Sequence, residues 1–189
     1  MRRHVTYEEL AVTIADIAAK LRFGIAAEEF ERAFDDLGRA LGFATQRPDR
    51  QYRAGPDNLW ALGGQDYLLV EAKSEVAATR AEITKKESGQ MNNACGWFRE
   101  QYDGAAATRI LVIPPRMLAT GAVFGEDVRI MRAKHLNALA QNVRAFFAEF
   151  RAMALTDITE AQVQERLIAH KLTVKDLTAS RYAEPPVSA

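Results

Sequence analysis

The segment from Tyr67 to Lys73 restricts the possible folds of this chain more than any other part of the sequence. It reads Tyr-Leu-Leu-Val-Glu-Ala-Lys and follows directly after the turn Gly63-Gly64-Gln65-Asp66. A short, almost continuous apolar run of this kind is typical of a strand that is buried on both faces. The apolar run Asn58 to Leu62 lies before the turn. The two runs and their glycine turn therefore predict a β-hairpin whose second strand is central in a sheet.

Helical and strand patterns alternate around this hairpin. Thr6 followed by Glu9 has the spacing of a capping box and opens the first helix, and Gly42 is placed to end the second. Residues 47–50 are expected to form a turn. Apolar residues recur at helical intervals over about 6–24, 26–41, 80–102, 139–150 and 163–168, and short buried strands are expected at 109–113 and 127–131. This order predicts an α/β (mixed) fold with a small mixed sheet between helices.

The length and composition predict one domain. The chain has 189 residues, of which 48% are hydrophobic and 26% are charged, a balance that allows a chain of this size to bury a core. We expect a single domain over residues 1–178, with its core at about 26–155 and a helical addition at about 156–178. Residues 179–189 contain Pro185 and Pro186 among small residues, so this end is expected to be a disordered tail.

The charge, the cysteine count and the apolar runs exclude several classes of protein. Twenty-five basic residues balance 25 acidic ones, which argues against binding nucleic acid or membrane through overall charge but allows a local basic patch. The single cysteine, Cys95, excludes an internal disulfide and a zinc-finger site. No apolar run approaches the roughly 20 residues that span a bilayer, and no secretory leader is evident. We therefore expect a cytoplasmic protein.

Two carboxylates and an ammonium group are expected to meet at one end of the hairpin. Asp57 precedes the first strand and Glu71-Ala72-Lys73 ends the second, with the glycine turn midway between them. Strand side chains alternate between faces, which places Glu71 and Lys73 on one face and Ala72 on the other. Asp57 shares that face only if the hairpin has an odd-length loop or a bulge, and Gly63-Gly64 supplies residues that tolerate the left-handed backbone a bulge requires.

This arrangement suits metal-dependent hydrolysis. Converging carboxylates repel each other unless a cation lies between them, and Mg²⁺ commonly binds through a few carboxylates together with water and substrate phosphates. A metal at this place would activate water and offset charge on a phosphoryl oxygen, as phosphodiester cleavage requires. The alternative is that Glu71 and Lys73 are only the polar end of a core strand and that Asp57 is a turn residue.

The same residues resemble a known family of nucleases. Pro56-Asp57, a hairpin and then Glu71-Ala72-Lys73 resemble the PD-(D/E)XK superfamily, which has the restriction-endonuclease-like fold, and the resemblance extends from about Glu28 to Met131. It implies a restriction-endonuclease-like core with a small mixed four-stranded sheet flanked by helices, and Mg²⁺-dependent hydrolysis of nucleic acid. In this chain we expect extra N- and C-terminal helices, namely the first helix and the segment after about Leu155. The family's exonuclease branch has a Tyr four residues after a helical Gln, where this chain has Ala94.

The resemblance also assigns roles to individual residues. Asp57, Glu71 and the carbonyl of Ala72 would bind Mg²⁺, for which Mn²⁺ would substitute, and Lys73 would position or activate the water. Glu31, on the helix before the sheet, matches the position of an additional acidic ligand and should face the cluster, whereas Glu28 and Asp35 should be more exposed. Gln90, on the helix after the second strand, matches a supporting glutamine.

Basic side chains near this site are candidates for binding backbone phosphates. They are Arg47, Arg50 and Arg53, which precede Asp57, and Lys86. A solvated loop is the alternative interpretation. Lys86 shares one helical face with Gln90, Asn93 and Trp97, of which Trp97 is expected to be buried.

The sequence thus predicts a metal-dependent nuclease, with DNA favoured over RNA as its substrate. The progression Leu41-Gly42-Phe43, Arg47-Pro48 and Gly55-Pro56-Asp57-Asn58-Leu59-Trp60 is also similar to nuclease domains that accompany helicases in prokaryotic antiviral defence systems. That similarity implies a helicase or recognition partner, and a homodimer stays open. The alternative is a catalytically inactive nucleic-acid-binding or assembly module of the same fold.

Overall fold

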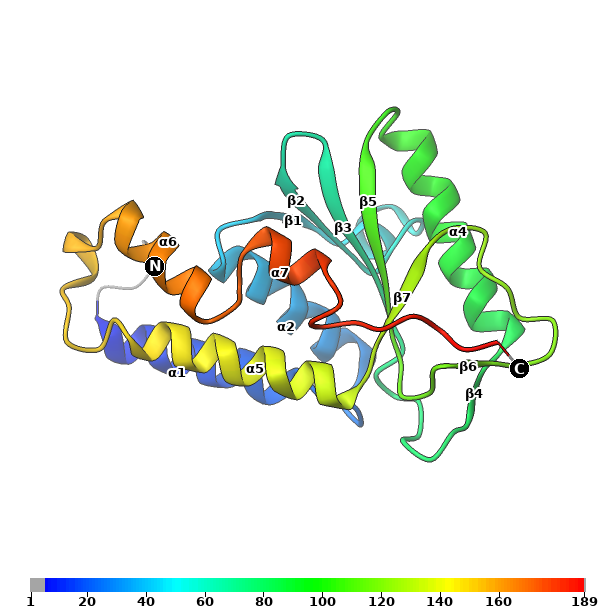
Figure 1. Cartoon of the computed structure of the whole chain (residues 1–189), viewed down its shortest axis with the longest axis horizontal. Helices are drawn as coiled ribbons and strands as arrows, with labels where there is room; N and C mark the ends of the chain where they lie inside the picture. The colour runs from blue at the N-terminus through cyan, green and yellow to red at the C-terminus, as the bar shows by residue number, and fades with distance from the viewer. Residues whose placement is uncertain (1–5, 189) are drawn as a thin grey trace.

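The computed structural model describes residues 6–188 and forms a mixed α/β fold (Figure 1). No helix in this range is both long and apolar enough to cross a bilayer. The elements are α1 (Tyr7–Lys20), α2 (Ala27–Ala40), β1 (Ala44–Gln46), α3 (Pro48–Tyr52), β2 (Asn58–Gly63), β3 (Asp66–Ala72), β4 (Glu82–Ile83), α4 (Lys85–Gln101), β5 (Ala106–Val112), β6 (Met117–Leu118), β7 (Val128–Met131), α5 (Ala133–Ala148), the 3₁₀ helix η1 (Leu155–Asp157), α6 (Glu160–Ala169) and α7 (Val174–Thr178).

The main sheet is mixed and has β3 at its centre. Its five strands lie in the order β1-β2-β3-β5-β7, and β4 pairs with β6 in a separate two-stranded sheet. The pairs β1–β2 and β2–β3 are antiparallel, whereas β3–β5 and β5–β7 are parallel. The four-stranded sheet expected from the resemblance is therefore wrong by one strand, because the short strand β1 pairs with β2 and extends the antiparallel half of the sheet.

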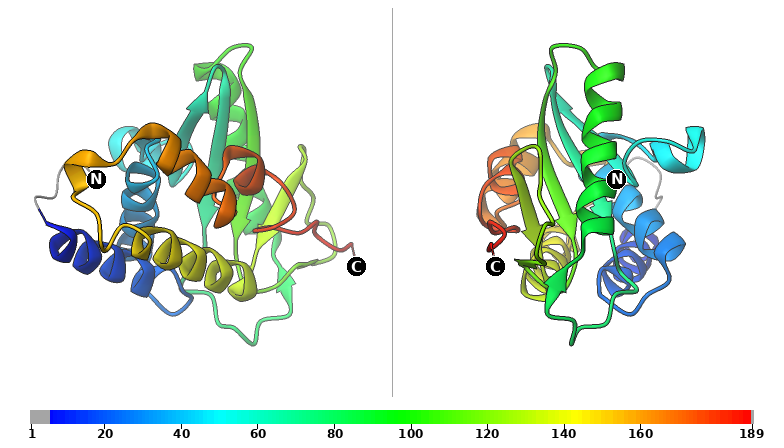
Figure 2. Two further views of the ribbon diagram at one scale, coloured as in Figure 1. Left: turned by 60° about the vertical axis from the view of Figure 1, so that its left-hand side comes forward. Right: turned by 90° about the vertical axis from the view of Figure 1, so that its right-hand side faces the viewer.

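The two faces of the sheet are covered by different helices (Figures 1 and 2). Trp60 and Val70 face α1, α2 and α5, and the Trp60 ring stacks on Phe34 of α2 at a centroid distance of 4.7 Å. Leu69 and its neighbours on the other face pack under α4. Each strand of the hairpin thus has apolar partners on both faces, as its nearly continuous apolar sequence predicts.

Local sequence signals explain where the helices begin and end. Thr6 caps α1 by accepting a hydrogen bond from the N–H of Glu9, and Gly42 follows α2 with φ +95°. Helix α4 begins at Lys85, about five residues later than expected, because Thr84 and Glu87 form a capping box there. The expected turn at 47–50 is instead the start of the short helix α3, which has a proline in its first turn.

The segment after α7 differs from the disordered tail that its composition predicts. Tyr182 is fully buried, and its hydroxyl donates a hydrogen bond of 2.8 Å to the carbonyl of Lys171. Glu184 exchanges two backbone hydrogen bonds with Ile130 of β7, at 2.7 and 3.0 Å. The outer edge of β7 would otherwise expose unpaired backbone groups, so this segment closes that edge of the sheet.

His135 helps to begin helix α5, and we expect it to make the fold less stable in acid. Its Nδ1 accepts a hydrogen bond of 3.0 Å from the N–H of Arg132. Burial lowers the pKa of His135 from its ordinary value of 6.5; the charge of Glu184 opposes this effect, and those of Lys134 and Arg132 add to it. Because the folded-state pKa is the lower one, the neutral ring stabilises the fold above pH 6.5, and this contribution is lost as the pH falls through 6.5 and then through the folded-state pKa.

The substitution His135→Gln tests this role. Glutamine at the same helical position keeps an acceptor for the cap but does not titrate. Between pH 7 and pH 5 we expect the natural protein to lose about 1 kcal/mol more of its unfolding free energy than the variant. Urea denaturation at both pH values measures the two losses, and equal losses would show that the cap does not depend on the protonation of His135.

Candidate active site

The register of the hairpin brings Asp57 opposite Glu71. Asn58 pairs with Val70 and Leu59 with Leu69, so continuing the antiparallel ladder by one residue places Asp57 across from Glu71. Opposed residues of an antiparallel pair lie on the same face. This register exists because the ladder shifts by one residue between Ala61 and Gly63, next to the turn, and Gly63 has φ +116°. The bulge that the sequence requires is present.

Asp57, Glu71 and Lys73 form a compact polar cluster at the end of β3. The Oδ2 atom of Asp57 accepts a hydrogen bond of 2.7 Å from the N–H of Ala72. The Lys73 Nζ atom lies 2.9 Å from Oε1 of Glu71. Asp57 and Glu71 are buried, and Lys73 is partly buried. The structure therefore brings together the three side chains on which the sequence interpretation depends.

Burial disfavours the ionised forms of both carboxylates. It raises the pKa of Glu71 to about 7, and the charge of Asp57 adds to this effect while Lys73 opposes it. Burial also raises the pKa of Asp57, against the lowering effects of the Ala72 N–H and of Lys73. Burial alone would lower the pKa of Lys73, but the nearby carboxylates, Glu71 first, outweigh it and the net shift is upward. A cation added to this cluster would favour the ionised carboxylates.

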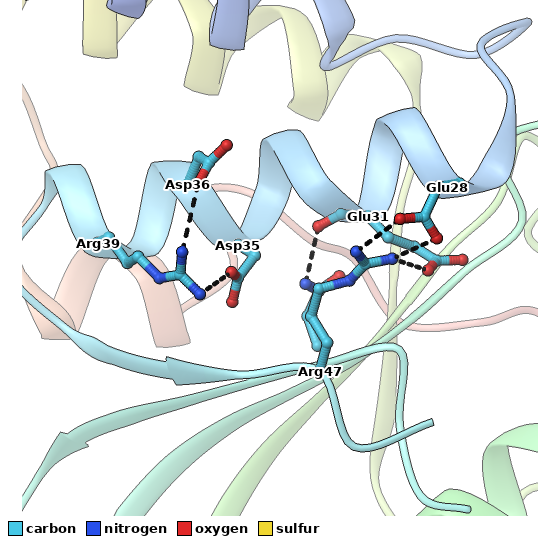
Figure 3. Close-up of polar contacts among 7 residues, drawn as sticks. Glu28, Glu31, Asp35, Asp36, Arg39 and Arg47 are labelled. Atoms are coloured by element: carbon cyan, nitrogen blue, oxygen red, sulfur yellow. Dashed lines mark hydrogen bonds and ion pairs between the residues drawn. The ribbon is translucent and has the colours of Figure 1, made fainter. Parts of the chain in front are cut away.

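Glu31 joins the site from α2 and is held by Arg47 (Figure 3). The Arg47 guanidinium lies 2.6 Å from Oε2 of Glu31 and also forms a two-bond pair with Glu28, at 3.0 and 3.1 Å. The side-chain amide of Asn58, next to Asp57, donates a hydrogen bond of 2.9 Å to the backbone carbonyl of Glu31. These contacts fix the second turn of α2 beside the start of β2.

Electrostatics also connect Glu31 to the cluster. Burial raises the pKa of Glu31 to about 7, the charge of Asp57 raises it further, and Arg47 opposes both. The charge of Glu31 is in turn one of the influences that raise the pKa of Lys73. Glu28 is exposed, as the sequence predicts, but the same expectation for Asp35 is wrong. Asp35 is buried because it lies on the core face of α2, where Arg39 pairs with it at 2.5 Å.

The donor atoms at this place fit a hard divalent cation. Asp57 and Glu71 supply carboxylates, and one oxygen of Asp57 already accepts the hydrogen bond from the Ala72 N–H. Within residues 6–188 no group of three or more His, Cys, Asp or Glu side chains is arranged to hold a metal ion. The protein thus offers two carboxylates, and such a partial oxygen set is the kind that Mg²⁺ commonly completes with water and substrate phosphates.

The remaining candidate residues lie outside this cluster. Gln90 and Lys86 are exposed on α4, and neither side chain makes a hydrogen bond or ion pair with another residue of the 6–188 range. Arg50 and Arg53 are exposed on and after α3. Arg47 differs from them because its guanidinium already faces Glu28 and Glu31, so its charge is compensated within the fold.

Sequence reasoning missed the pairing of Arg47 with Glu28 and Glu31. Glu28 and Glu31 are three residues apart on α2 and therefore lie on one helical face, which is a signal for a shared cation. It also missed the buried Asn58, which follows Asp57 directly and joins β2 to α2. The sequence gives no signal for the role of Asn58, because this residue lies at the start of the strand, where a polar side chain does not disturb the apolar pattern.

Comparison with known proteins identifies no relative. No protein-family model, no curated protein and no solved structure matches the chain. The functional interpretation therefore depends on the chemistry of this site alone.

Proposed function

We propose that this protein is a Mg²⁺-dependent nuclease with a restriction-endonuclease-like core. The observation that carries the proposal is the convergence of Asp57, Glu71 and Lys73 at the end of the central strand β3. Two buried carboxylates beside a lysine are costly to maintain unless they serve a ligand, because burial disfavours their ionised forms. DNA is the favoured substrate.

Each residue of the site would have a specific role in metal binding, catalysis or phosphate binding. Asp57, Glu71 and the Ala72 carbonyl would hold Mg²⁺, with Glu31 as a further acidic neighbour. The bound ion would lower the pKa of a water molecule and offset charge on a phosphoryl oxygen. Lys73, held against Glu71, would orient the attacking water and stabilise the negative charge that develops on the phosphate. Gln90 would support the site from α4, and Arg50, Arg53 and Lys86 would bind backbone phosphates.

A second candidate is an inactive nucleic-acid-binding or assembly module with the same fold. One observation favours it: each acidic group of the site already has a cation or a backbone donor, since Lys73 pairs with Glu71, Arg47 with Glu31 and the Ala72 N–H with Asp57. Such a cluster is also compatible with a purely structural role. For either candidate, a helicase or another recognition partner linked to a defence system would supply the specificity.

A cleavage assay separates the two candidates. Purified full-length chain is incubated with single-stranded DNA, duplex DNA and RNA in Mg²⁺, in Mn²⁺ and in excess EDTA. We expect cleavage of DNA with either metal and none with EDTA. Asp57→Asn should be inactive, whereas Asp16→Asn, an exposed carboxylate on α1, should cleave normally. No cleavage of any substrate under any metal condition would leave the binding module as the better interpretation.

A further inference from the structure

An exposed aromatic side chain stands beside the candidate active site. Tyr52 ends the short helix α3 and is 64% exposed, an unusual place for a large aromatic ring. One side of the ring lies over Trp97 of α4, with a centroid distance of 6.4 Å and an interplanar angle of 24°. Its other side faces solvent. We call this pair, Tyr52 and Trp97, the stacking platform.

Trp97, the ring of the stacking platform on which Tyr52 lies, is packed against several other groups. Trp97 contacts the ring of Tyr102 at 6.0 Å, and Tyr102 stacks on the buried Phe98 at 5.1 Å. On another side, Gly55 lies so close to the indole that a Cβ atom there would come within 2.7 Å of it. Gly55 also has φ +91°, which an L side chain rarely adopts. An exposed ring on such a support loses little further freedom when it binds a ligand.

The stacking platform is close to the carboxylates of the site. The N–H of Asp49, in α3, donates a hydrogen bond of 3.2 Å to the carbonyl of Pro56, the residue before Asp57, which folds α3 back beside the start of β2. The charge of Asp49 is among the influences that raise the pKa of Asp57 and the pKa of Glu71, as expected for a helix that borders the cluster. Figure 2 shows α3 in cyan, projecting outward next to α4.

Two exposed basic side chains lie close to Tyr52 in the sequence. Neither Arg50 nor Arg53 forms an ion pair with a described residue, although the charge of Arg50 is one of those that lower the pKa of Glu28. An aromatic face next to exposed cations is the combination with which proteins bind single-stranded nucleic acid, since the cations follow the phosphates while a base stacks on the ring. Bases within a duplex are stacked on one another and cannot offer a face in this way.

We propose that the stacking platform binds an unpaired base, so that the protein takes single-stranded DNA, or a single-stranded part of a longer DNA, into its active site. This inference rests on the proposed function in that it assumes a nucleic-acid substrate. Arg50 and Arg53 contact the phosphates on either side of the stacked base. The strand then continues past Pro56 toward Asp57 and Glu71.

A binding experiment without cleavage tests the stacking platform separately from the nuclease activity. The full-length chain is titrated in EDTA with three fluorescein-labelled probes: a 12-nucleotide oligodeoxythymidylate, an abasic strand of the same length, and a blunt duplex. We expect tightest binding to the oligodeoxythymidylate. Tyr52→Ala should weaken that binding roughly 5-fold to 150-fold, the range measured for loss of one base–aromatic stack, and leave binding to the abasic strand unchanged.

Two further variants and an optical signal make the test specific. Tyr52→Trp keeps an aromatic face and should bind as the natural protein does. Tyr7→Ala, at the start of α1, should have no effect. Of the two tryptophans, Trp60 is fully buried, so quenching of tryptophan fluorescence by the oligonucleotide should come from Trp97. Unchanged binding in Tyr52→Ala, or equal affinity for the thymidylate and abasic strands, overturns the proposal. Base-dependent binding without any Mg²⁺-dependent cleavage would instead support the stacking platform and contradict the nuclease.

Discussion

The variant Glu71→Gln is expected to lose both metal binding and cleavage. Glutamine has nearly the same shape as glutamate but lacks the charge that a hard cation requires, and Asp57 would remain as the nearest carboxylate. We expect no detectable heat in a calorimetric titration with Mn²⁺. Cleavage should fall by at least about 10³-fold, since the bound metal contributes several kcal/mol to the stabilisation of the transition state.

The same variant should remain folded. Burial disfavours the ionised form of Glu71, whose pKa is raised to about 7, so replacing it with a neutral residue removes an unfavourable charge. Glu100→Gln, which alters an exposed carboxylate on the last part of α4, is the matched control and should retain both metal binding and activity. Full activity in a folded Glu71→Gln protein would remove Glu71 from the catalytic site.

Lys73→Met should separate metal binding from cleavage. Lys73 is not a ligand in the proposed site, so the variant should bind Mn²⁺ with equal or slightly higher affinity, because the carboxylates lose a competing cation. Cleavage should nevertheless fall by roughly 10²- to 10³-fold, the typical effect of removing one group that stabilises charge in the transition state. The measurement is the same titration beside a single-turnover cleavage assay.

The control for Lys73→Met is Lys20→Met, which removes a partly exposed, ion-paired lysine from α1 and should change neither quantity. Methionine keeps the length and the apolar stem of the lysine, so the end of β3 should pack as before. Loss of Mn²⁺ binding in a correctly folded Lys73→Met protein would mean that Lys73 supports the ligands structurally. Cleavage at the natural rate would mean that it has no part in the reaction.

The hairpin could be predicted from the sequence because its signals are local. Because strand side chains alternate between faces, counting residues shows that Asp57 and Glu71 share a face only if the pairing of the two strands shifts by one residue. Gly63-Gly64 indicates where this shift occurs. The helix α1 was equally predictable, since Thr6 and the following apolar residues specify its start and its buried face. In these elements the secondary-structure propensity, the hydrophobic pattern and the turn residues all favour the same structure. Such agreement is what allows a structure to be predicted from sequence.

The features that could not be predicted depend on distant partners. Arg47 is a basic residue just before the site, so the sequence favours a phosphate-binding role for it. Only the packing of α2 against the hairpin shows that its guanidinium forms ion pairs with Glu28 and Glu31. Residues 179–188 have the composition of a disordered tail. They nevertheless have a defined structure, because Glu184 pairs with the edge of β7 and Tyr182 is buried in the core. The contact of Tyr52 with Trp97 joins two segments that are far apart in the sequence, and no sequence pattern predicts that they meet.

The pairing of Glu184 with the edge of β7 also has a consequence for synthesis on the ribosome. Ile130 is made before Glu184, which pairs with it, and the roughly fifty residues between them take about 3–11 seconds at about 5–20 residues per second. During that interval β7 can already join β5, but its outer backbone groups have no partner. An edge of this kind can pair with the same edge of another nascent chain. Slowed translation of α5 and α6 should therefore lower the yield of folded protein without changing the stability of the finished fold.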